Sequence, residues 1–326
     1  MAVTARHLVF PLVLAVLLLY VYQTDETTDP GELTCGGRLE VREKVVVVTG
    51  GCRGLGYQIS LELARRGARL VLGCRNSAAA RAVRQRIVAA TGSSRVSVIG
   101  LDMARMKHIS TFVYNLKQTY DQVDVLINNA ATRAGPEREE TVEGLEVVTA
   151  TNYLGPLHLT QSLGPVLAQG GLVINLVERN SQEEPDLGDL NSEHQYQPGL
   201  VYLRSKQLLQ RMTRLLAARL TSVSVFSVEP CQVWTGLHTS LPSWLPHLLS
   251  DWLVWVVGPL LPSSQVREAA RTVVWLAGRG QEESARSQSG LTWHSCQPAP
   301  AGESQLTELD QLQTMSDLLI QRALRS

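Results

Sequence analysis

The stretch Val45–Gly56 reads VVVVTGGCRGLG and predicts how the fold begins. Four β-branched residues in a row are typical of a strand that is buried on both faces. The glycines allow a tight turn, and helical periodicity follows through Leu55, Ile59 and Leu63. Strand, glycine-rich turn and helix in this order predict backbone N–H groups that approach a phosphate at the helix N-terminus. The alternative is a glycine turn that binds no ligand.

The alternation of strand and helix continues to about residue 230. We expect further strands at residues 68–73, 95–102, 123–130, 172–177 and 222–230. Helices are expected at residues 55–66, 77–90 (with Ser77 as N-cap), 106–120, 152–167, 202–220 and 305–324. Residues 281–305 are expected to form a loop around one short strand, LTWHS. This alternation predicts an α/β fold with a single doubly wound parallel sheet and helices on both faces.

Composition and charge exclude several classes of protein. The 326 residues are 44% hydrophobic and 18% charged, which is typical of a globular protein. The 30 basic and 30 acidic residues give a net charge of zero, so no nucleic-acid-binding face is expected. The five cysteines include no C-x-x-C pair, and the seven histidines lack metal-ligand spacing. Neither a disulfide framework nor a bound metal is therefore expected.

The N-terminal segment differs from this average. Leu8–Tyr22 reads LVFPLVLAVLLLYVY, a run without a charged residue that follows Arg6 and His7. It is short for a membrane span of about 20 residues, and it also matches the apolar region of a cleavable signal peptide. No small-residue cleavage site follows, which favours an uncleaved anchor over removal of residues 1–23 and secretion. An anchor predicts a protein of the endoplasmic reticulum membrane or of lipid droplets, and the lack of an N-x-[ST] sequon favours a cytosolic body.

Two arginines lie where a dinucleotide would be recognised. Arg53 is in the glycine turn, and Arg75 follows the second expected strand in the sequence GCRN. Dinucleotide-binding folds that prefer NAD often place an acidic residue there to bind the ribose hydroxyls. Guanidinium groups suit a 2′-phosphate instead, so we expect NADP(H) to be preferred over NAD(H). The alternative for either arginine is a solvated surface charge.

Tyr202 and Lys206, in the sequence VYLRSK, are the candidates for proton transfer. Residues four apart lie on the same face of a helix. A tyrosine with its free pKa of about 10 exchanges protons poorly at neutral pH, and a neighbouring ammonium lowers that pKa toward the working range. On its own, this spacing is also common on a solvated helix face.

Taken together and in order, these motifs resemble the short-chain dehydrogenase/reductase family over residues 40–295. The order is TGGCRGLG, LD at Asp102, NNA at residues 128–130, Asn152 in TNYLG, YLRSK, and VEP at Pro230. The sequences RGARLVLGCRN, NYLGPLHLT and DLNSE resemble the membrane-associated retinol dehydrogenase-like branch, including its polyprenol dehydrogenase-like member. The resemblance implies a single Rossmann-type domain, with residues 1–39 as anchor and linker and residues 296–326 as a C-terminal linker and helix.

The resemblance implies a role for each residue that matches a family motif. It implies Tyr202 as general acid and base, Lys206 as the residue that holds the ribose and tunes Tyr202, and Asn152 as part of a proton relay. Together with the two arginines, the expected nucleotide contacts are Gly50, Arg53, Gly54, Leu55, Gly56, Arg75, Asp102, Asn129, Tyr202 and Lys206.

The chain departs from the family pattern at three positions. Ala131 replaces the glycine of NNAG, and Cys231 replaces the glycine of the PG pair after the sixth strand. The strand at residues 172–177 ends with Glu178, at the position where members of the family carry the catalytic serine. The nearest hydroxyl is Ser181, which is three residues further and too far without a rearranged loop.

Glu178 leaves three alternatives open. Ionised, it would repel a developing phenolate: like charges about 4 Å apart repel by about 4 kcal/mol at an effective dielectric constant near 20, or roughly 3 pKa units on Tyr202. Protonated, it could donate a hydrogen bond to a carbonyl. Turned toward solvent, Arg179 or Arg204, it would leave the site without a hydroxyl. Because Asn152, Tyr202 and Lys206 are present, we expect a slow oxidoreductase; the alternative is an inactive nucleotide-binding pseudoenzyme or membrane-tethered scaffold.

Residues 231–265 are the expected substrate lid. They carry Trp244, Trp252 and Trp255 among leucines and valines, which suits a lipophilic substrate and a seat on a membrane surface. A lid helix packed on its own domain is the alternative. With the N-terminal anchor, the lid favours a retinoid, polyprenoid or steroid-like alcohol and its aldehyde or ketone. A homodimer is also compatible with the sequence.

Overall fold

The computed structural model describes residue 35, residue 39 and residues 41–178, 185–230, 263–279, 286–299 and 306–326. The expected anchor at residues 8–22 and the expected lid up to residue 262 lie outside this part of the chain, as do Arg179 and Ser181. Within the described ranges, no helix combines the length and the apolar character that a membrane crossing requires.

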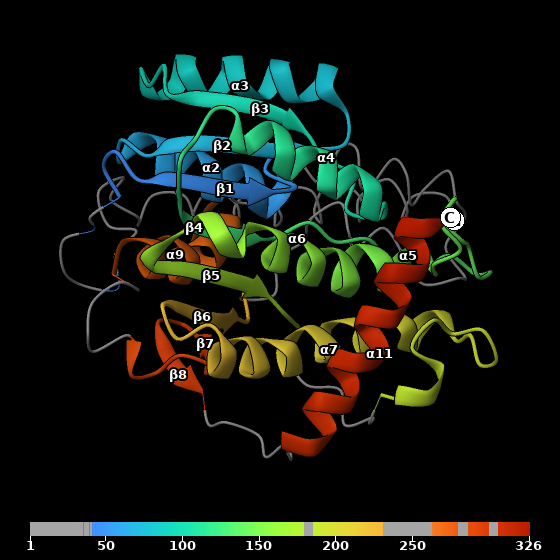
Figure 1. Ribbon diagram of the computed structural model, residues 1–326. Coiled ribbons are helices and arrows are strands. Elements are labelled where there is room, and N and C mark those ends of the chain that lie inside the picture. Colours follow the sequence, from blue (N-terminus) through green and yellow to red (C-terminus); the bar gives the residue numbers. More distant parts are fainter. Residues whose placement is uncertain are drawn as a thin grey trace, which may run out of the picture.

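Within the same ranges, the strands form one sheet in the order β3-β2-β1-β4-β5-β6-β7-β8 (Figure 1). The strands that pair in parallel are β1 (Val45–Thr49), β2 (Arg69–Cys74), β3 (Val96–Gly100), β4 (Val123–Asn128), β5 (Leu167–Leu176), β6 (Val223–Val228) and β7 (Thr292–His294). The edge strand β8 (Gln297–Ala299) pairs with β7 in the antiparallel direction. The expected doubly wound parallel sheet is confirmed, with one antiparallel strand added at its edge.

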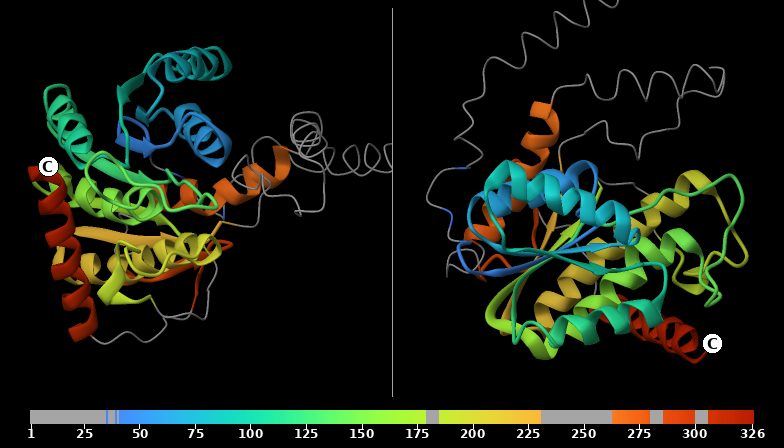
Figure 2. Two further views of the ribbon diagram at one scale, coloured as in Figure 1. Left: turned by 90° about the vertical axis from the view of Figure 1, so that its right-hand side faces the viewer. Right: turned by 90° about the horizontal axis from the view of Figure 1, so that it is seen from above.

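Helices cover both faces of the sheet (Figure 2). One face carries α2 (Gly54–Arg65), α3 (Ser77–Thr91) and α9 (Ser263–Arg279), and the other carries α4 (Met106–Lys117), α6 (Gly155–Leu163) and α7 (Pro198–Arg219). The long helix α11 (Leu306–Arg325) packs across α4 and α7 on the outside of the second face (Figure 1). The short helices are α5 (Val147–Thr149), η1 (Ala150–Leu154), η2 (Gly164–Val166) and η3 (Leu187–Asp189).

The valines of β1 are apolar at every position because both faces of the strand are covered. Val45 and Val47 belong to the core beneath α4, α6 and α7, whereas Val46 and Val48 belong to the core beneath α2 and α9. All four side chains are buried. A strand with helices on both faces has no solvated side, so it reads as a continuous hydrophobic run instead of alternating with polar residues.

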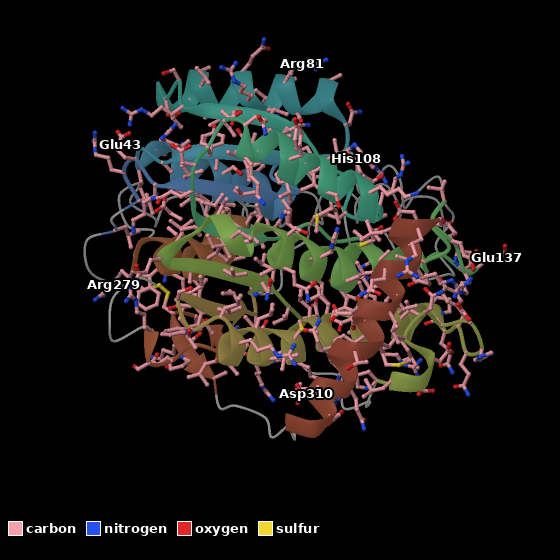
Figure 3. The ribbon with its side chains drawn as sticks, in the orientation of Figure 1. Glu43, Arg81, His108, Glu137, Arg279 and Asp310 are labelled. Carbon is pink, nitrogen blue, oxygen red and sulfur yellow. A yellow bond between two sulfur atoms is a disulfide. The ribbon has the colours of Figure 1, made fainter. Side chains whose placement is uncertain are left out.

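The carboxyl ends of β1 and β4 form the crevice of this fold. From β1 the chain winds outward to β2 and β3 and then returns to β4 on the other side of β1. In open α/β sheets, ligands bind at this point, outside the carboxyl ends of the strands. The glycine turn leaves β1 at this edge. Figure 3 shows His108 and Glu137 on this side of the molecule and Arg279 on the opposite side.

Two helix boundaries near the site differ from those expected. Helix α7 begins at Pro198, so Tyr202 lies in its second turn instead of at its start. The helix expected from Asn152 opens with the π-helical segment η1, and the chain enters β5 at Leu167, earlier than expected.

Other elements were placed one residue away or missed. The N-cap of α3 is Asn76 instead of Ser77: the Asn76 side chain accepts a hydrogen bond from the Ala79 backbone N–H at 3.0 Å. Helix α9 and strand β8 were not expected. Helix α9 packs on α2, which lies far earlier in the chain, whereas β8 is a three-residue strand that pairs with its sequence neighbour β7.

The cysteines also differ from expectation, because four of the five are paired. Disulfides join Cys52 to Cys74 and Cys35 to Cys296. The partners are 22 and 261 residues apart, so only the fold brings them together. The fifth, Cys231, lies outside the described residues. The expectation was wrong because it used spacing motifs that identify local pairs only.

Helix α11 is joined to α7 and η1 by polar contacts. The Tyr153 side chain in η1 is fully buried, and its hydroxyl shares a 2.6 Å hydrogen bond with the Ser316 hydroxyl of α11. On α7, Arg219 pairs with Asp310 at 2.8 Å, and Arg211 pairs with Glu308. The helix is therefore part of the domain's interior packing.

Candidate active site

The glycine turn is held against the ends of β2 and β4. Gly50 has a φ of +65°, and its N–H donates to the Gly73 carbonyl at 2.8 Å. A Cβ on Gly56 would lie 2.4 Å from both the Asn129 side-chain nitrogen and the Gly50 carbonyl oxygen. Such close approach explains why the turn needs glycine at these positions. Helix α2 starts at Gly54 with no acidic side chain in its first turn, so its N-terminus favours an anion.

We expect Gly56→Ala to damage this turn. The added methyl would force the turn away from Asn129, so we expect a loss of about 2 kcal/mol in the free energy of unfolding and at least a tenfold loss in NADPH affinity. Urea unfolding and NADPH fluorescence titration measure the two effects. Gly199→Ala is the matched control, because a Cβ there meets nothing within 4 Å. Equal behaviour of the two variants would contradict this account of the turn.

Asn129 holds the turn from the side of β4. Its side-chain nitrogen donates to the backbone carbonyls of Thr49 and Gly50, at 2.9 and 3.2 Å. The Thr49 hydroxyl accepts in turn from the backbone N–H groups of Asn129 and Ala130, both at 3.0 Å. The structure thus places the Asn129 amide in contact with the protein backbone.

The other expected nucleotide residues surround the same edge. Arg53 and Arg75 are exposed at the ends of β1 and β2. Asp102 follows β3: its carboxylate accepts from the Ala104 N–H at 3.1 Å. The side chain of Leu55 is buried in the core, so only its backbone can face a ligand.

Tyr202 and Glu178 are in direct contact, which selects among the three alternatives for Glu178. Glu178 lies just beyond β5, and the Tyr202 hydroxyl donates a hydrogen bond to its carboxylate at 2.9 Å. Glu178 is therefore turned toward the tyrosine and not toward Arg204. Burial, the negative charge of Glu178 and this hydrogen bond together raise the pKa of Tyr202 well above its ordinary value, and the Arg133 charge opposes them.

Lys206 does not tune the tyrosine as expected. Its side chain is buried, and its ammonium donates to the Leu176 carbonyl at the end of β5, at 2.8 Å. Burial lowers the pKa of Lys206 to about 8, against the opposing charge of Glu178. Burial is the largest cause of the raised pKa of Tyr202, and the charged groups that act on it are Glu178, which raises it further, and Arg133, which lowers it. The expected lowering of the Tyr202 pKa is therefore wrong, and the opposing effect expected of Glu178 is confirmed in direction.

Asn152 connects the loop after β4 to α7. Its side-chain oxygen accepts from the Thr132 N–H at 2.8 Å, and its nitrogen donates to the Thr132 carbonyl and to the Ser205 hydroxyl, at 2.9 and 3.0 Å. The residue is buried within the π-helical turn η1, a local feature that is frequent at functional sites. Ser205 then donates to the Tyr202 carbonyl at 2.7 Å. Asn152 and Ser205 thus support the turn of α7 that carries the tyrosine.

Two residues that the sequence did not single out shape the site. The Arg133 guanidinium lies 5.1 Å from the centre of the Tyr202 ring, a cation–π distance. Ser205, three residues after Tyr202, links that helix to Asn152. Ser205 lies within the motif YLRSK, whereas Arg133 follows NNAA by two residues and belongs to no motif.

A cleft of about 360 Å³ opens beside these groups. It brings together the Arg53 of the glycine turn, the loop after β4 and the start of α5. Its lining residues are Arg53, Thr132, Arg133, Ala134, Gly135, Glu139, Glu146, Val147, Val148 and Tyr196. Val148 also packs against Tyr202, so the cleft adjoins the tyrosine.

Comparison with known proteins identifies the family. A family model described as short chain dehydrogenase matches residues 44–246. Retinol dehydrogenase 11 from Homo sapiens is 33% identical over 257 residues, which cover 75% of this chain and 79% of the relative. Polyprenol dehydrogenase from Homo sapiens is 31% identical over 226 residues, which cover 66% of this chain and 68% of the relative.

Solved structures show the same fold. An uncharacterized protein from Mycobacterium paratuberculosis is 24% identical and superimposes with a TM-score of 0.67, covering 86% of this chain and 96% of its own. A short chain dehydrogenase from Shigella flexneri, complexed with NADP, is 20% identical with a TM-score of 0.59, covering 79% of this chain and 99% of its own. The chain belongs to the short-chain dehydrogenase/reductase family, in the branch that contains the retinol and polyprenol dehydrogenases.

Proposed function

We propose that this protein is an NADP(H)-dependent oxidoreductase that reduces a lipophilic aldehyde or ketone to its alcohol. The observation that carries the proposal is the position of Tyr202. Its ring lies 5.1 Å from the guanidinium of Arg133, which lines the cleft. Lys206 on the same helix donates to the Leu176 carbonyl at the end of β5, at the sheet edge where the glycine turn leaves β1. A proton donor and an anion-binding turn at one edge are the two parts that carbonyl reduction requires.

The raised pKa of Tyr202 favours reduction over oxidation. Below its pKa the phenol keeps its proton and can donate it to a carbonyl oxygen, whereas oxidation of an alcohol needs the phenolate as base. Because burial and Glu178 raise that pKa, the phenolate is scarce at neutral pH. We therefore propose that the chain works as a reductase at neutral pH, and more slowly than relatives with a serine at position 178.

The residues present suit a dinucleotide with a 2′-phosphate. The N-terminus of α2 and the glycine turn would hold the pyrophosphate. The turn has no room for a Cβ at Gly56. The exposed guanidinium groups of Arg53 and Arg75 would hold the 2′-phosphate. Lys206 would hold the nicotinamide ribose, and Asp102 would hold the adenine. When bound, NADPH supplies the hydride, and Tyr202 supplies the proton.

The proposed substrate class follows from the branch and from the cleft. The curated relatives are named for retinol and polyprenol, both long apolar alcohols. The cleft beside Tyr202 offers Ala134, Val147, Val148 and Tyr196 as apolar or aromatic lining. We propose a retinoid-, polyprenoid- or steroid-like carbonyl, and a location at a membrane through the N-terminal segment. A Trp-rich lid at the membrane surface and a homodimer remain part of this proposal.

One observation favours a second candidate function, a nucleotide-binding protein without turnover. The only acceptor that the Tyr202 hydroxyl has among the described residues is the Glu178 carboxylate, and a substrate carbonyl would have to displace it. A hydrogen bond to a charged group contributes about 1.5–3 kcal/mol. If no substrate outweighs this contact, the protein would bind NADPH and stay inactive.

Turnover separates the two candidates. We expect the full chain in detergent to oxidise NADPH in the presence of a retinal- or polyprenal-type aldehyde, and to prefer NADPH over NADH by about tenfold or more because two guanidinium groups face the 2′-phosphate. Absorbance at the NADPH band and chromatography of the alcohol product measure the rate. NADPH binding without any product would favour the second candidate. A preference for NADH would contradict the roles of Arg53 and Arg75.

A further inference from the structure

A disulfide crosses the expected nucleotide site. Cys52 lies within the glycine turn and Cys74 is the last residue of β2, and their Cα atoms are 6.4 Å apart. The bond therefore joins the turn that follows β1 to the carboxyl end of β2. Nothing in the spacing of 22 residues indicated this pair.

The disulfide extends a contact that the backbone begins. The parallel pairing of β1 with β2 ends at Thr49 and Gly73, and the Gly50 N–H still reaches the Gly73 carbonyl at 2.8 Å. Beyond this point the turn leaves the sheet. The Cys52–Cys74 disulfide then fixes the turn to β2, two residues past Gly50 in the turn and one residue past Gly73 in the strand.

The residue after each cysteine is an arginine proposed to bind the 2′-phosphate. Arg53 follows Cys52, and Arg75 follows Cys74, and both side chains are exposed. Because each arginine is covalently adjacent to a bonded cysteine, the disulfide limits how far apart the two guanidinium groups can move. Holding two charged groups in place before binding lowers the entropy that binding must supply.

We propose that Cys52 and Cys74 form a redox-sensitive pair that sets the affinity of the site for NADP(H). With the disulfide formed, the turn and the end of β2 present both arginines to one phosphate. With the disulfide reduced, the turn is held only by its backbone contacts and by the Asn129 side chain, and the affinity for NADPH falls. The inference rests on the proposed function, because it concerns the same nucleotide site.

The chemistry of the switch is a two-electron thiol–disulfide exchange with a dithiol reductant. Cys52 is the more accessible sulfur, because Cys74 is only 5% exposed. A reductant thiolate attacks the Cys52 sulfur, forms a mixed disulfide and releases the Cys74 thiolate, which takes up a proton. The second thiolate of the reductant then displaces the Cys52 thiolate, which is also protonated. The protein gains two thiols, and the reductant becomes a disulfide.

The test compares NADPH and NADH affinity in oxidised and reduced protein. Fluorescence titration of the full chain, before and after treatment with dithiothreitol, is expected to show about a tenfold weaker NADPH affinity after reduction and a smaller change for NADH. Cys52→Ser is expected to have the weaker affinity in both conditions and no response to the reductant. Cys35→Ser/Cys296→Ser removes the other disulfide and is the matched control, expected to keep the response. Peptide mapping without reductant is expected to recover Cys52 and Cys74 linked.

Each other outcome has a distinct meaning. Free thiols at Cys52 and Cys74 in air-oxidised, folded protein would overturn the inference, and so would equal NADPH affinity in the two redox states. Loss of the response in the Cys35→Ser/Cys296→Ser control would also overturn it, because the effect would then come from the other disulfide. Binding of neither nucleotide in either state would overturn the proposed function first, and the inference with it.

Discussion

Replacing Tyr202 with phenylalanine is expected to abolish the proposed NADPH-dependent reduction of the aldehyde, while NADPH affinity should stay within a factor of about three of wild type. The substitution removes only the hydroxyl that would donate the proton. Loss of a general acid costs 10²–10⁴-fold in rate, so the variant should fall at or below the detection limit of a slow enzyme. Initial rates at saturating NADPH, together with an NADPH titration, measure both effects.

Tyr196→Phe is the matched control for this experiment. Tyr196 lines the neighbouring cleft, but its hydroxyl donates to the Gly135 carbonyl at 3.0 Å instead of to Glu178. We expect the control to keep most of the wild-type rate. A Tyr202→Phe protein with unchanged turnover would show that the reaction, if any, takes place elsewhere.

Replacing Glu178 with serine is expected to raise kcat/KM for reduction by about 10–100-fold. Glu178 accepts the proton donor's hydrogen bond at 2.9 Å, so a substrate carbonyl competes with a charged acceptor. Serine removes the charge and offers a neutral hydroxyl that can itself donate to the carbonyl. The expected factor corresponds to the 1.5–3 kcal/mol of a charge-assisted hydrogen bond.

The pH dependence gives this prediction a second readout. Tyr202 must be protonated to donate, and we propose that Lys206 holds the nicotinamide ribose as an ammonium. The rate should therefore decline as pH rises through the pKa of Lys206, about 8. Glu178 raises the pKa of both groups. Its removal therefore lowers both, and the alkaline decline should move to lower pH in Glu178→Ser.

Glu178→Gln separates the effect of charge from that of shape. It removes the negative charge and keeps an amide oxygen that can still accept from Tyr202. We expect the same direction of pH shift with a smaller gain in rate.

A wild type that is inert while Glu178→Ser is active would establish the second candidate function, a protein that retained the fold and lost turnover. A decrease in rate in both variants would show that Glu178 assists the reaction.

Much of the fold was accessible from the sequence, because strand and helix periodicities reflect burial. The run at Val45–Val48 predicted a strand covered on both faces, and both cores contain its side chains. The glycine positions predicted the turn, since Gly56 has no room for a Cβ. Helix α9 packs on α2, far earlier in the chain, and was missed although Ala270, Val273 and Ala277 follow a helical period.

The candidate site was predicted in its residues but not in its contacts. The motifs named Tyr202, Lys206, Asn152 and Glu178, yet spacing along a helix could not show where the ammonium of Lys206 points. It reaches the Leu176 carbonyl, so burial dominates its pKa and Glu178 dominates its electrostatic surroundings. Arg133 could not be predicted as part of the site, because its contact with the Tyr202 ring depends on how the loop after β4 folds.

The hydrogen bond between Tyr153 and Ser316 has a consequence for synthesis on the ribosome. Tyr153 is the immediate neighbour of Asn152, and its partner lies 163 residues later in the chain. During translation, α11 emerges long after the sheet and α7. Until then the phenol of Tyr153 has no Ser316 to bond, and the apolar surface that α11 covers faces water. A nascent chain stalled before α11 would therefore carry every side chain proposed for catalysis and still expose the apolar surface that α11 covers in the finished fold.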